Sequence, residues 1–90
     1  LTLAPLAIKK LAALLRSYEL LIAIELVAGA QAVDLAKPAR VAPRLAEAHL
    51  AVRTLSPFIA DDRPLGTEIE RIATTLVGSG ALVAATGLHL

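Results

Sequence analysis

The chain has 90 residues, with nine Lys or Arg against eight Asp or Glu, and a formal net charge of +1. Hydrophobic residues make up 57% of it, above the roughly 45–50% of ordinary soluble domains. Because Cys is absent, disulfides, thiol catalysis and thiolate metal sites are excluded. The balanced charge, with no basic patch interleaved with aromatic residues, argues against a nucleic-acid partner.

Small and aliphatic side chains supply the apolar surface, since there is one Tyr, one Phe and no Met or Trp. Such side chains suit helices that pack closely side by side. A domain of this size buries only about 60–65% of its unfolded surface on its own, so apolar patches would stay exposed. We therefore expect burial against further chain or further subunits. The first residue is Leu rather than Met, and LTLAP resembles no targeting signal, so we expect a processed, truncated or split chain.

The chain begins with a predicted long helix over residues 1–36, starting near Ala4. Pro5 fits its first turn, where a missing N–H costs nothing, and Thr2 is a candidate cap. Pro38 disfavours helix in the residue before it and so ends the element. At 1.5 Å per residue, the 32 positions from Ala4 to Leu35 are about 48 Å long. A 90-residue globule would not enclose a helix of that length, so the sequence predicts one piece of a larger helical bundle.

The middle of that helix, residues 20–33, is LLIAIELVAGAQAV and carries one formal charge, Glu25, and one amide, Gln31. A membrane span needs about 20 predominantly apolar residues, and this run is shorter and charged. The apolar run over residues 77–90 contains three glycines. We therefore expect no membrane-spanning segment.

A helical projection at 100° per residue divides the long helix into two sides. Lys9, Arg16, Glu19, Gln31 and Asp34 share a polar side. It is interrupted for about three turns by apolar residues, where we expect a partner to cover the helix: Leu20, Ile24 and Val27. The opposite side is an apolar stripe interrupted only by Glu25, and it consists of Ala7, Leu11, Leu14, Tyr18, Leu21, Glu25, Ala28 and Ala32.

Glu25 is the sharpest candidate for chemistry. A desolvated carboxylate can act as a general acid or base. A buried glutamate more often pairs with an Arg or a hydroxyl of a neighbouring helix, and Tyr18, on the same stripe, is one possible partner. We favour the packing role.

Shorter helices are expected after a proline-containing connector. The first spans residues 44–55 and ends before Ser56-Pro57. A second spans residues 67–77, with Thr67 and Glu70 as a capping box and Gly78 as its stop. The end of the chain is expected to form either one more short helix, over residues 81–88, or a loose apolar tail over residues 81–90. With no strand signal, the fold class is all-α, with one long core helix and shorter capping helices over residues 37–90.

Other chemistry-bearing residues do not form a recognisable site. His49 and His89 lack a second ligand three or four positions away, which argues against zinc. Asp61-Asp62-Arg63 reads as a solvated turn before a helix. Gly78-Ser79-Gly80 has too few glycines for a phosphate loop and follows no strand. We therefore assign no catalytic, cofactor-binding or metal-binding residue.

Two segments together resemble the C-terminal end of the aromatic amino acid ammonia-lyases, the histidine/phenylalanine ammonia-lyase family. Residues 22–35, IAIELVAGAQAVDL, are similar to the family's IELLAAAQALDL stretch. Residues 57–70, PFIADDRPLGTEIE, are similar to its VPFLDEDRPLGPDIE stretch, and a helix and SGAL at residues 79–82 follow. The order and spacing match, so the resemblance covers essentially the whole chain.

The resemblance implies an all-α enzyme, usually a homotetramer, that eliminates ammonia from histidine, phenylalanine or tyrosine, or an aminomutase. Its electrophile is methylidene-imidazolone (MIO), formed from an internal Ala-Ser-Gly. This chain has no Ala-Ser-Gly, and Gly78-Ser79-Gly80 lies in the wrong region of the family pattern. The family's late glutamate, in a motif like QEDHVSMG, falls just before residue 1. Carried over residue by residue, no catalytic position remains, and Glu25 matches the family's helix-core glutamate.

The leading interpretation is therefore a C-terminal segment or small subunit of a cytoplasmic ammonia-lyase, inactive alone. L-histidine is the preferred substrate and urocanate the product, with MIO in an upstream portion. The partners would be the remaining catalytic portion and the other subunits of a homotetramer. The alternatives are a phenylalanine or tyrosine ammonia-lyase or aminomutase, and a stand-alone helical oligomerisation module without catalysis.

Overall fold

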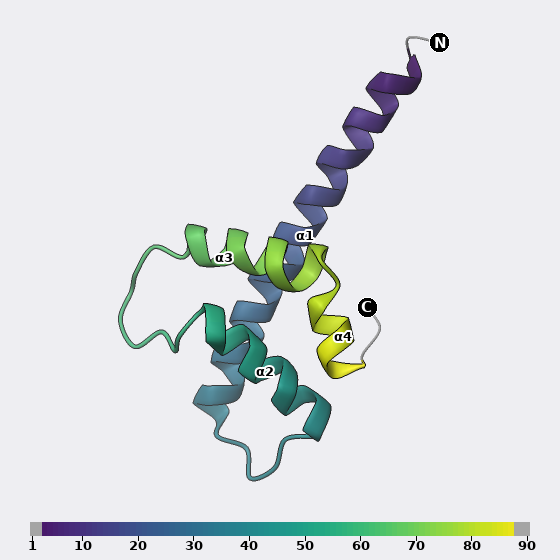
Figure 1. Cartoon of the computed structure of the whole chain (residues 1–90). Coiled ribbons are helices and arrows are strands. Elements are labelled where there is room, and N and C mark those ends of the chain that lie inside the picture. Colours follow the sequence, from purple (N-terminus) through teal and green to yellow (C-terminus); the bar gives the residue numbers. More distant parts are fainter. Residues whose placement is uncertain (1–2, 88–90) are drawn as a thin grey trace.

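The computed structural model describes residues 3–87, and every regular element in that range is helical (Figure 1). This confirms the all-α fold class. The elements in chain order are α1 (Leu3–Ala36), α2 (Pro43–Leu55), α3 (Gly66–Ile72), the π-helix η1 (Ala73–Gly78) and α4 (Ala81–Thr86). The candidate cap Thr2 and the residue His89 lie outside the described residues.

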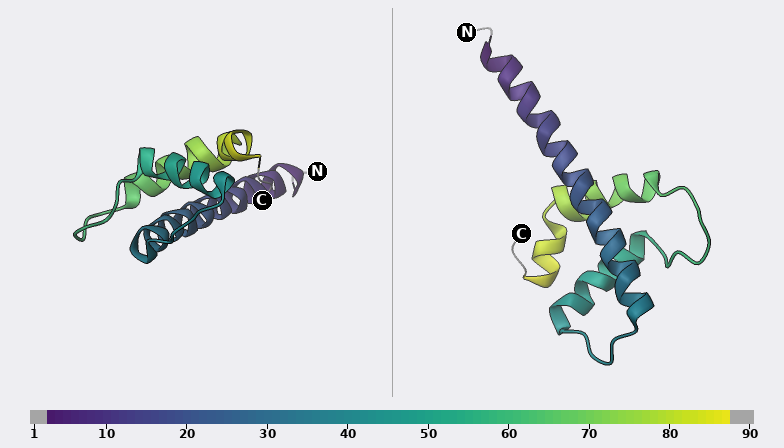
Figure 2. Two further views of the ribbon diagram at one scale, coloured as in Figure 1. Left: turned by 90° about the horizontal axis from the view of Figure 1, so that it is seen from below. Right: turned by 180° about the vertical axis from the view of Figure 1, so that it is seen from behind.

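The helices form two layers, with α1 alone in one and all the other helices in the second (Figure 2). The second layer covers only the C-terminal half of α1, so the N-terminal half projects alone (Figure 1). The longest dimension of the molecule is 57 Å and the shortest 17 Å. One long helix with shorter helices packed against it is what the sequence predicted.

The core lies where α1 crosses the second layer. Small side chains on α1 let the other backbones come close, as at Ala23, which is completely buried. The core residues are Ala23, Val27 and Ala30 of α1, Val52 of α2, Ile72 of α3, Ala73 and Leu76 of η1, and Leu82 of α4. This core is narrow, because it uses one face of one half of α1.

The buried face of α1 is the side that the sequence marked as polar. Val27 lies in the predicted apolar interruption of that side and is 4% exposed. The chain's own later helices supply the covering partner expected at Val27, whereas Ile24, in the same interruption, stays 48% exposed. The opposite apolar stripe is no part of this chain's core, since Leu14 is 68% and Tyr18 65% exposed. Glu25 is exposed too, because the chain has only enough helices to cover one side of α1.

The ends of the helices follow the local sequence in part. After α1, Lys37 adopts a positive φ of 47° and donates its amide to the Val33 carbonyl at 3.1 Å, so the chain turns just before Pro38. The second helix begins at Pro43, one residue before the expected start, because proline is well placed in a first helical turn.

The predicted capping box at the start of the third helix is wrong. The N-cap is Leu65, with no side-chain cap hydrogen bond, and Thr67 lies inside α3. The expected single helix over residues 67–77 is α3 followed by η1, which ends at Gly78 as predicted. Gly80 precedes α4 with a φ of 76°. Within the described residues, no helix is both long enough and apolar enough to cross a bilayer.

Candidate functional site

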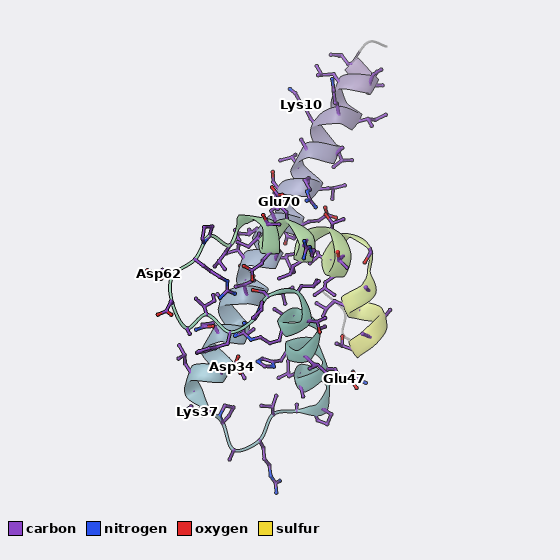
Figure 3. All side chains as sticks on the ribbon, turned by 60° about the vertical axis from the view of Figure 1, so that its left-hand side comes forward. Lys10, Asp34, Lys37, Glu47, Asp62 and Glu70 are labelled. Atoms are coloured by element: carbon purple, nitrogen blue, oxygen red, sulfur yellow. The ribbon has the colours of Figure 1, made fainter. Side chains whose placement is uncertain are left out.

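The densest polar cluster joins α1, α2 and the loop that follows α2. Asp34 on α1 faces α2 (Figure 3), where its two carboxylate oxygens contact His49 Nε2 at 2.9 Å and Arg53 Nη2 at 2.7 Å. Arg53 Nε also donates to Asp34 at 2.8 Å. The spacing explains the encounter, since residues three or four positions apart share a helix face. Two such pairs, Gln31 with Asp34 and His49 with Arg53, meet here.

Gln31 extends this cluster to the loop. Its amide nitrogen donates to the Ile59 carbonyl at 2.9 Å, and its amide oxygen accepts from the Ile59 N–H at 3.1 Å. The same oxygen accepts a bond from Arg53 Nη2 at 3.2 Å. One glutamine thus pairs with the backbone of a residue 28 positions away, which fixes the loop against α1.

Arg53 is the centre of the cluster and its side chain is only 12% exposed. Besides its bonds to Asp34 and Gln31, it donates through Nη1 to the Ser56 carbonyl at 3.0 Å. Its guanidinium lies 5.8 Å from the centre of the Phe58 ring. All three guanidinium nitrogens are engaged, so Arg53 holds protein elements together and has little capacity left for a bound anion.

The electrostatics of Asp34 agree with a structural role. The hydrogen bond from Arg53 lowers the pKa of its carboxyl below the ordinary 3.8, and the contact with His49 also lowers it, against an opposing effect of partial burial. An acid or base that acts near neutral pH needs the opposite shift. Asp34 therefore stays ionised and acts as the anion that joins the two helices.

A second cluster fixes the long loop between α2 and α3. Arg63 binds Glu68 through Nη2 at 2.9 Å and Nε at 3.2 Å, and it donates to the carbonyls of Pro57 at 2.7 Å and Phe58 at 3.3 Å. Chiefly through Arg63, the pKa of Glu68 falls below its ordinary 4.5. The buried Ser56 hydroxyl also lowers this pKa, although it lies outside hydrogen-bonding geometry to any protein atom in the described chain.

The remaining candidates from the sequence have ordinary surroundings. Asp61 and Asp62 are exposed in the loop, which agrees with a solvated turn. Ser79 donates to the Thr75 carbonyl and accepts the Ala81 N–H at 3.1 Å, so its hydroxyl orders the turn before α4. Among the described residues, no three His, Asp or Glu side chains gather as metal ligands would.

Glu25 is separate from both clusters. In the part of the chain that the structure describes, its carboxylate has neither an ion pair nor a hydrogen bond, and Tyr18 does not bond to it. It lies at the edge of an open groove of about 230 Å³ between α1 and α2, whose walls are apolar apart from Glu25 and His49.

The sequence did not foresee the Gln31–Asp34–His49–Arg53 cluster. The only available signal was the spacing of three and four positions within each helix, which says nothing about which faces meet. The structure brings together the polar ends of the two helices and leaves Glu25 outside.

Comparison with curated proteins gives several histidine ammonia-lyases as relatives. The chain is 42% identical over 77 residues to a histidine ammonia-lyase of Sorangium cellulosum, an alignment that covers 86% of this chain and 15% of that protein. It is 46% identical over 61 residues to one of Anaeromyxobacter sp. (strain K), covering 68% and 12% respectively. For one of Koribacter versatilis the identity is 38% over 76 residues, covering 84% and 14%. The chain thus spans about one seventh of the length of these relatives.

No family model matches the chain. No solved structure matches it either. The curated relatives therefore carry the comparison.

Proposed function

We propose, from the premise that this chain matches a segment of the ammonia-lyase family, that it is the C-terminal segment or a small subunit of a histidine ammonia-lyase. The observation that carries the proposal is the identity of 38–46% to several histidine ammonia-lyases over most of this chain. The reaction would convert L-histidine to urocanate and ammonia. Phenylalanine, tyrosine and an aminomutase reaction are the alternatives within the same family.

The positions of the two family-like motifs support a scaffolding role for this segment. Residues 22–35 contain Gln31 and Asp34, and residues 57–70 contain Arg63 and Glu68. Arg63 and Glu68 form the second polar cluster, and Gln31 and Asp34 are the α1 half of the first, whose other members, His49 and Arg53, lie between the motifs. The two family-like motifs thus coincide with contacts that hold the helices of this chain together. The resemblance therefore requires no reacting group within this chain.

The chemistry would then lie in another portion of the protein. MIO arises from Ala-Ser-Gly, which this chain lacks, and the only serine between glycines is Ser79. Its hydroxyl is hydrogen-bonded to the Thr75 carbonyl and the Ala81 amide, and the residue before it is Gly78 rather than an alanine. The residues present do not fit the group, so no step of the reaction is assigned to them. We propose that MIO belongs to an upstream portion.

The same proposal gives this chain its partners. Its long helix would join the central bundle of a cytoplasmic homotetramer beside the catalytic portion. The exposed apolar side of α1, with Leu14 68% exposed, supports a further covering partner. The same exposure also favours the second candidate function, a stand-alone oligomerisation module without catalysis.

The deciding experiment measures the intact mass and activity of the protein from which the chain comes. Purified protein is incubated separately with L-histidine, L-phenylalanine and L-tyrosine, and ammonia and the unsaturated acid are quantified. We expect a polypeptide or complex several times larger than 9.3 kDa that releases ammonia from histidine. The 90-residue chain purified alone is the control and should release none. A native protein of 9.3 kDa without such activity would reject the lyase and favour the module.

A further inference from the structure

An open groove follows one side of α1 for about four turns. Its first part is a hollow lined by Tyr18, Ile22, Glu25 and Leu26. The hollow between α1 and α2 continues it, because Glu25 and Leu26 line both. Its last α1 residue is Val33, so the α1 wall is about 22 Å long at 1.5 Å per residue. We call this surface, from Tyr18 to Val33 with the facing side of α2, the α1–α2 groove.

The α1–α2 groove has room for another backbone and apolar surface for it to cover. Small residues, among them Gly29, Ala30 and Ala48, form much of its lining. A Cβ added at Gly29 meets nothing within 4 Å. On the α2 side Leu45 is 56% exposed. An exposed apolar surface of this kind marks a contact with other protein.

Glu25 gives the groove a single carboxylate without a partner. The other ionisable residue of its lining, His49, already contacts Asp34 through Nε2 at 2.9 Å. Among the described residues, neither part of the groove is lined by a Lys or an Arg. A carboxylate that loses water when an apolar surface covers it is costly unless a cation pairs with it. A surface that covers the groove must therefore bring a positive charge to Glu25.

The backbone of the groove's walls indicates the form of the occupant. Both walls are helices, α1 and α2, whose interior N–H and C=O groups pair within their own helix. An extended segment laid between them would bury its own N–H and C=O groups without partners. A helix satisfies these groups internally and presents side chains three and four positions apart to the groove. The occupant that fits is therefore an amphipathic helix with a cation among its apolar side chains.

We propose that the α1–α2 groove binds a helix of the catalytic portion of the lyase, with apolar side chains over Gly29 and one Arg or Lys paired with Glu25. This assignment rests on the proposed function. The matched segment is only 12–15% of the length of the histidine ammonia-lyases, so such a protein contains a large portion outside this chain. Charge complementarity then selects a basic helix from that portion.

Thiol labelling tests whether the groove is covered, because the chain has no natural cysteine. The Gly29→Cys variant is made in the 90-residue chain and in the parent protein with its catalytic portion. Labelling at position 29 is followed by peptide mass, and circular dichroism verifies the helix content. We expect labelling to be slower in the parent protein by about tenfold or more, and equal in the two proteins after unfolding in urea. Equal rates in the folded proteins would overturn the proposal.

The concentration of the 90-residue chain identifies a different occupant. If a second copy covers the groove, labelling of Gly29→Cys in the chain alone will slow as the chain concentration rises. That result would overturn the assignment to the catalytic portion. We expect a rate independent of concentration.

A change of charge tests the cation at Glu25. In the parent protein, Glu25→Lys added to Gly29→Cys should speed labelling several-fold, because like charges would then meet and open the groove. Glu25→Gln should speed it less, and it serves as the second variant if the lysine prevents folding. Glu47→Lys is the matched control, since Glu47 is exposed on α2 (Figure 3) and lies outside the groove lining. Equal effects of Glu25→Lys and Glu47→Lys would show that no cation faces Glu25.

Ammonia release from L-histidine, measured on the same parent protein, separates this inference from the proposed function. An active lyase in which position 29 labels rapidly would keep the function and overturn the groove contact. Slow labelling at position 29 in a larger but inactive protein would keep the groove contact and overturn the lyase. A native protein of 9.3 kDa would overturn both.

Discussion

Arg53 and Asp34 form the closest ion pair between the long helix and the second layer, with Arg53 Nη2 and Nε at 2.7 and 2.8 Å from the same carboxylate oxygen. The pair joins the last turns of α1 to the end of α2. The apolar contacts of α2 with α1 are interrupted by the open groove beside Glu25. The docking of α2 on α1 therefore depends more strongly on this ion pair than it would if the apolar interface between the two helices were wider.

Arg53→Ala should destabilise the fold by about 1–3 kcal/mol, because it leaves partly buried acceptors without their donor. The groups affected are the Asp34 carboxylate, the Gln31 amide oxygen and the Ser56 carbonyl. Urea unfolding followed by circular dichroism measures the change. Arg40→Ala, in the exposed connector, is the control and should change the stability by less than about 0.5 kcal/mol. Equal effects at Arg40 and Arg53 would contradict the central role of Arg53.

The stability of the chain should decrease in acid. The pKa values of Asp34 and Glu68 are lowered in the folded chain, chiefly by Arg53 and Arg63 respectively. The unfolded chain then binds protons more readily than the folded chain as the pH falls. The stabilisation is complete above the ordinary values of 3.8 and 4.5 and is lost as the pH falls through the lowered values. Thermal melts between pH 7 and 3 should show Tm falling mainly below about pH 5.

Variants assign this acid sensitivity. The double variant Asp34→Asn, Glu68→Gln should be less stable than the original chain at pH 7 and should show a flatter dependence of Tm on pH. Asp61→Asn, Asp62→Asn is the control, since both residues are exposed in the loop and should leave the slope unchanged. If the control pair flattens the slope and the first pair does not, the two clusters are not the cause.

The sequence predicted the helices better than it predicted their contacts. Prolines and glycines disfavour continued helix for reasons that lie in their own backbone chemistry. The extent of the long helix and the end of the third predicted helix at Gly78 could therefore be predicted. No proline, glycine or other feature of the sequence predicted the π-helical geometry of η1. Thr67 and Glu70 have the spacing of a capping box, yet the chain starts the helix one residue before Thr67, and Glu68 pairs with Arg63 instead.

The sequence predicted the contacts between the helices less well than the helices themselves. The projection of α1 gave two usable sides, and periodicity alone cannot say which one the same chain covers. The later helices pack against the side with Gln31 and Asp34, because His49 and Arg53 bind these two side chains. Glu25 on the other side was expected in a core, and in this structure it is exposed.

Arg63→Ala should loosen the loop between α2 and α3. The side chain holds Glu68 and two loop carbonyls, so its removal frees the loop backbone while leaving the core residues in place. We expect limited proteolysis to cleave residues 57–65 several-fold faster. Arg71→Ala on the exposed surface of α3 should leave the cleavage rate unchanged. A loop that stays resistant in Arg63→Ala would show that Gln31 alone fixes it.

Gly80 and Gly78 should respond differently to alanine. Gly80 has a φ of 76° and open space around it, so Gly80→Ala should cost about 1 kcal/mol through backbone strain alone. At Gly78 an added Cβ would come within 2.5 Å of Glu19 Oε2 and 3.2 Å of the Ala73 carbonyl. Because the first of these atoms ends a flexible side chain, Glu19 can move, at the expense of its contact with Arg16 at 3.5 Å.

The double variant Gly78→Ala, Glu19→Ala separates the two effects. We expect it to be more stable than Gly78→Ala alone in urea unfolding, since the added methyl group then has room, whereas Glu19→Ala should not improve Gly80→Ala. If Glu19→Ala leaves the cost of Gly78→Ala unchanged, that cost comes from the Ala73 carbonyl within η1 rather than from the Glu19 side chain of α1.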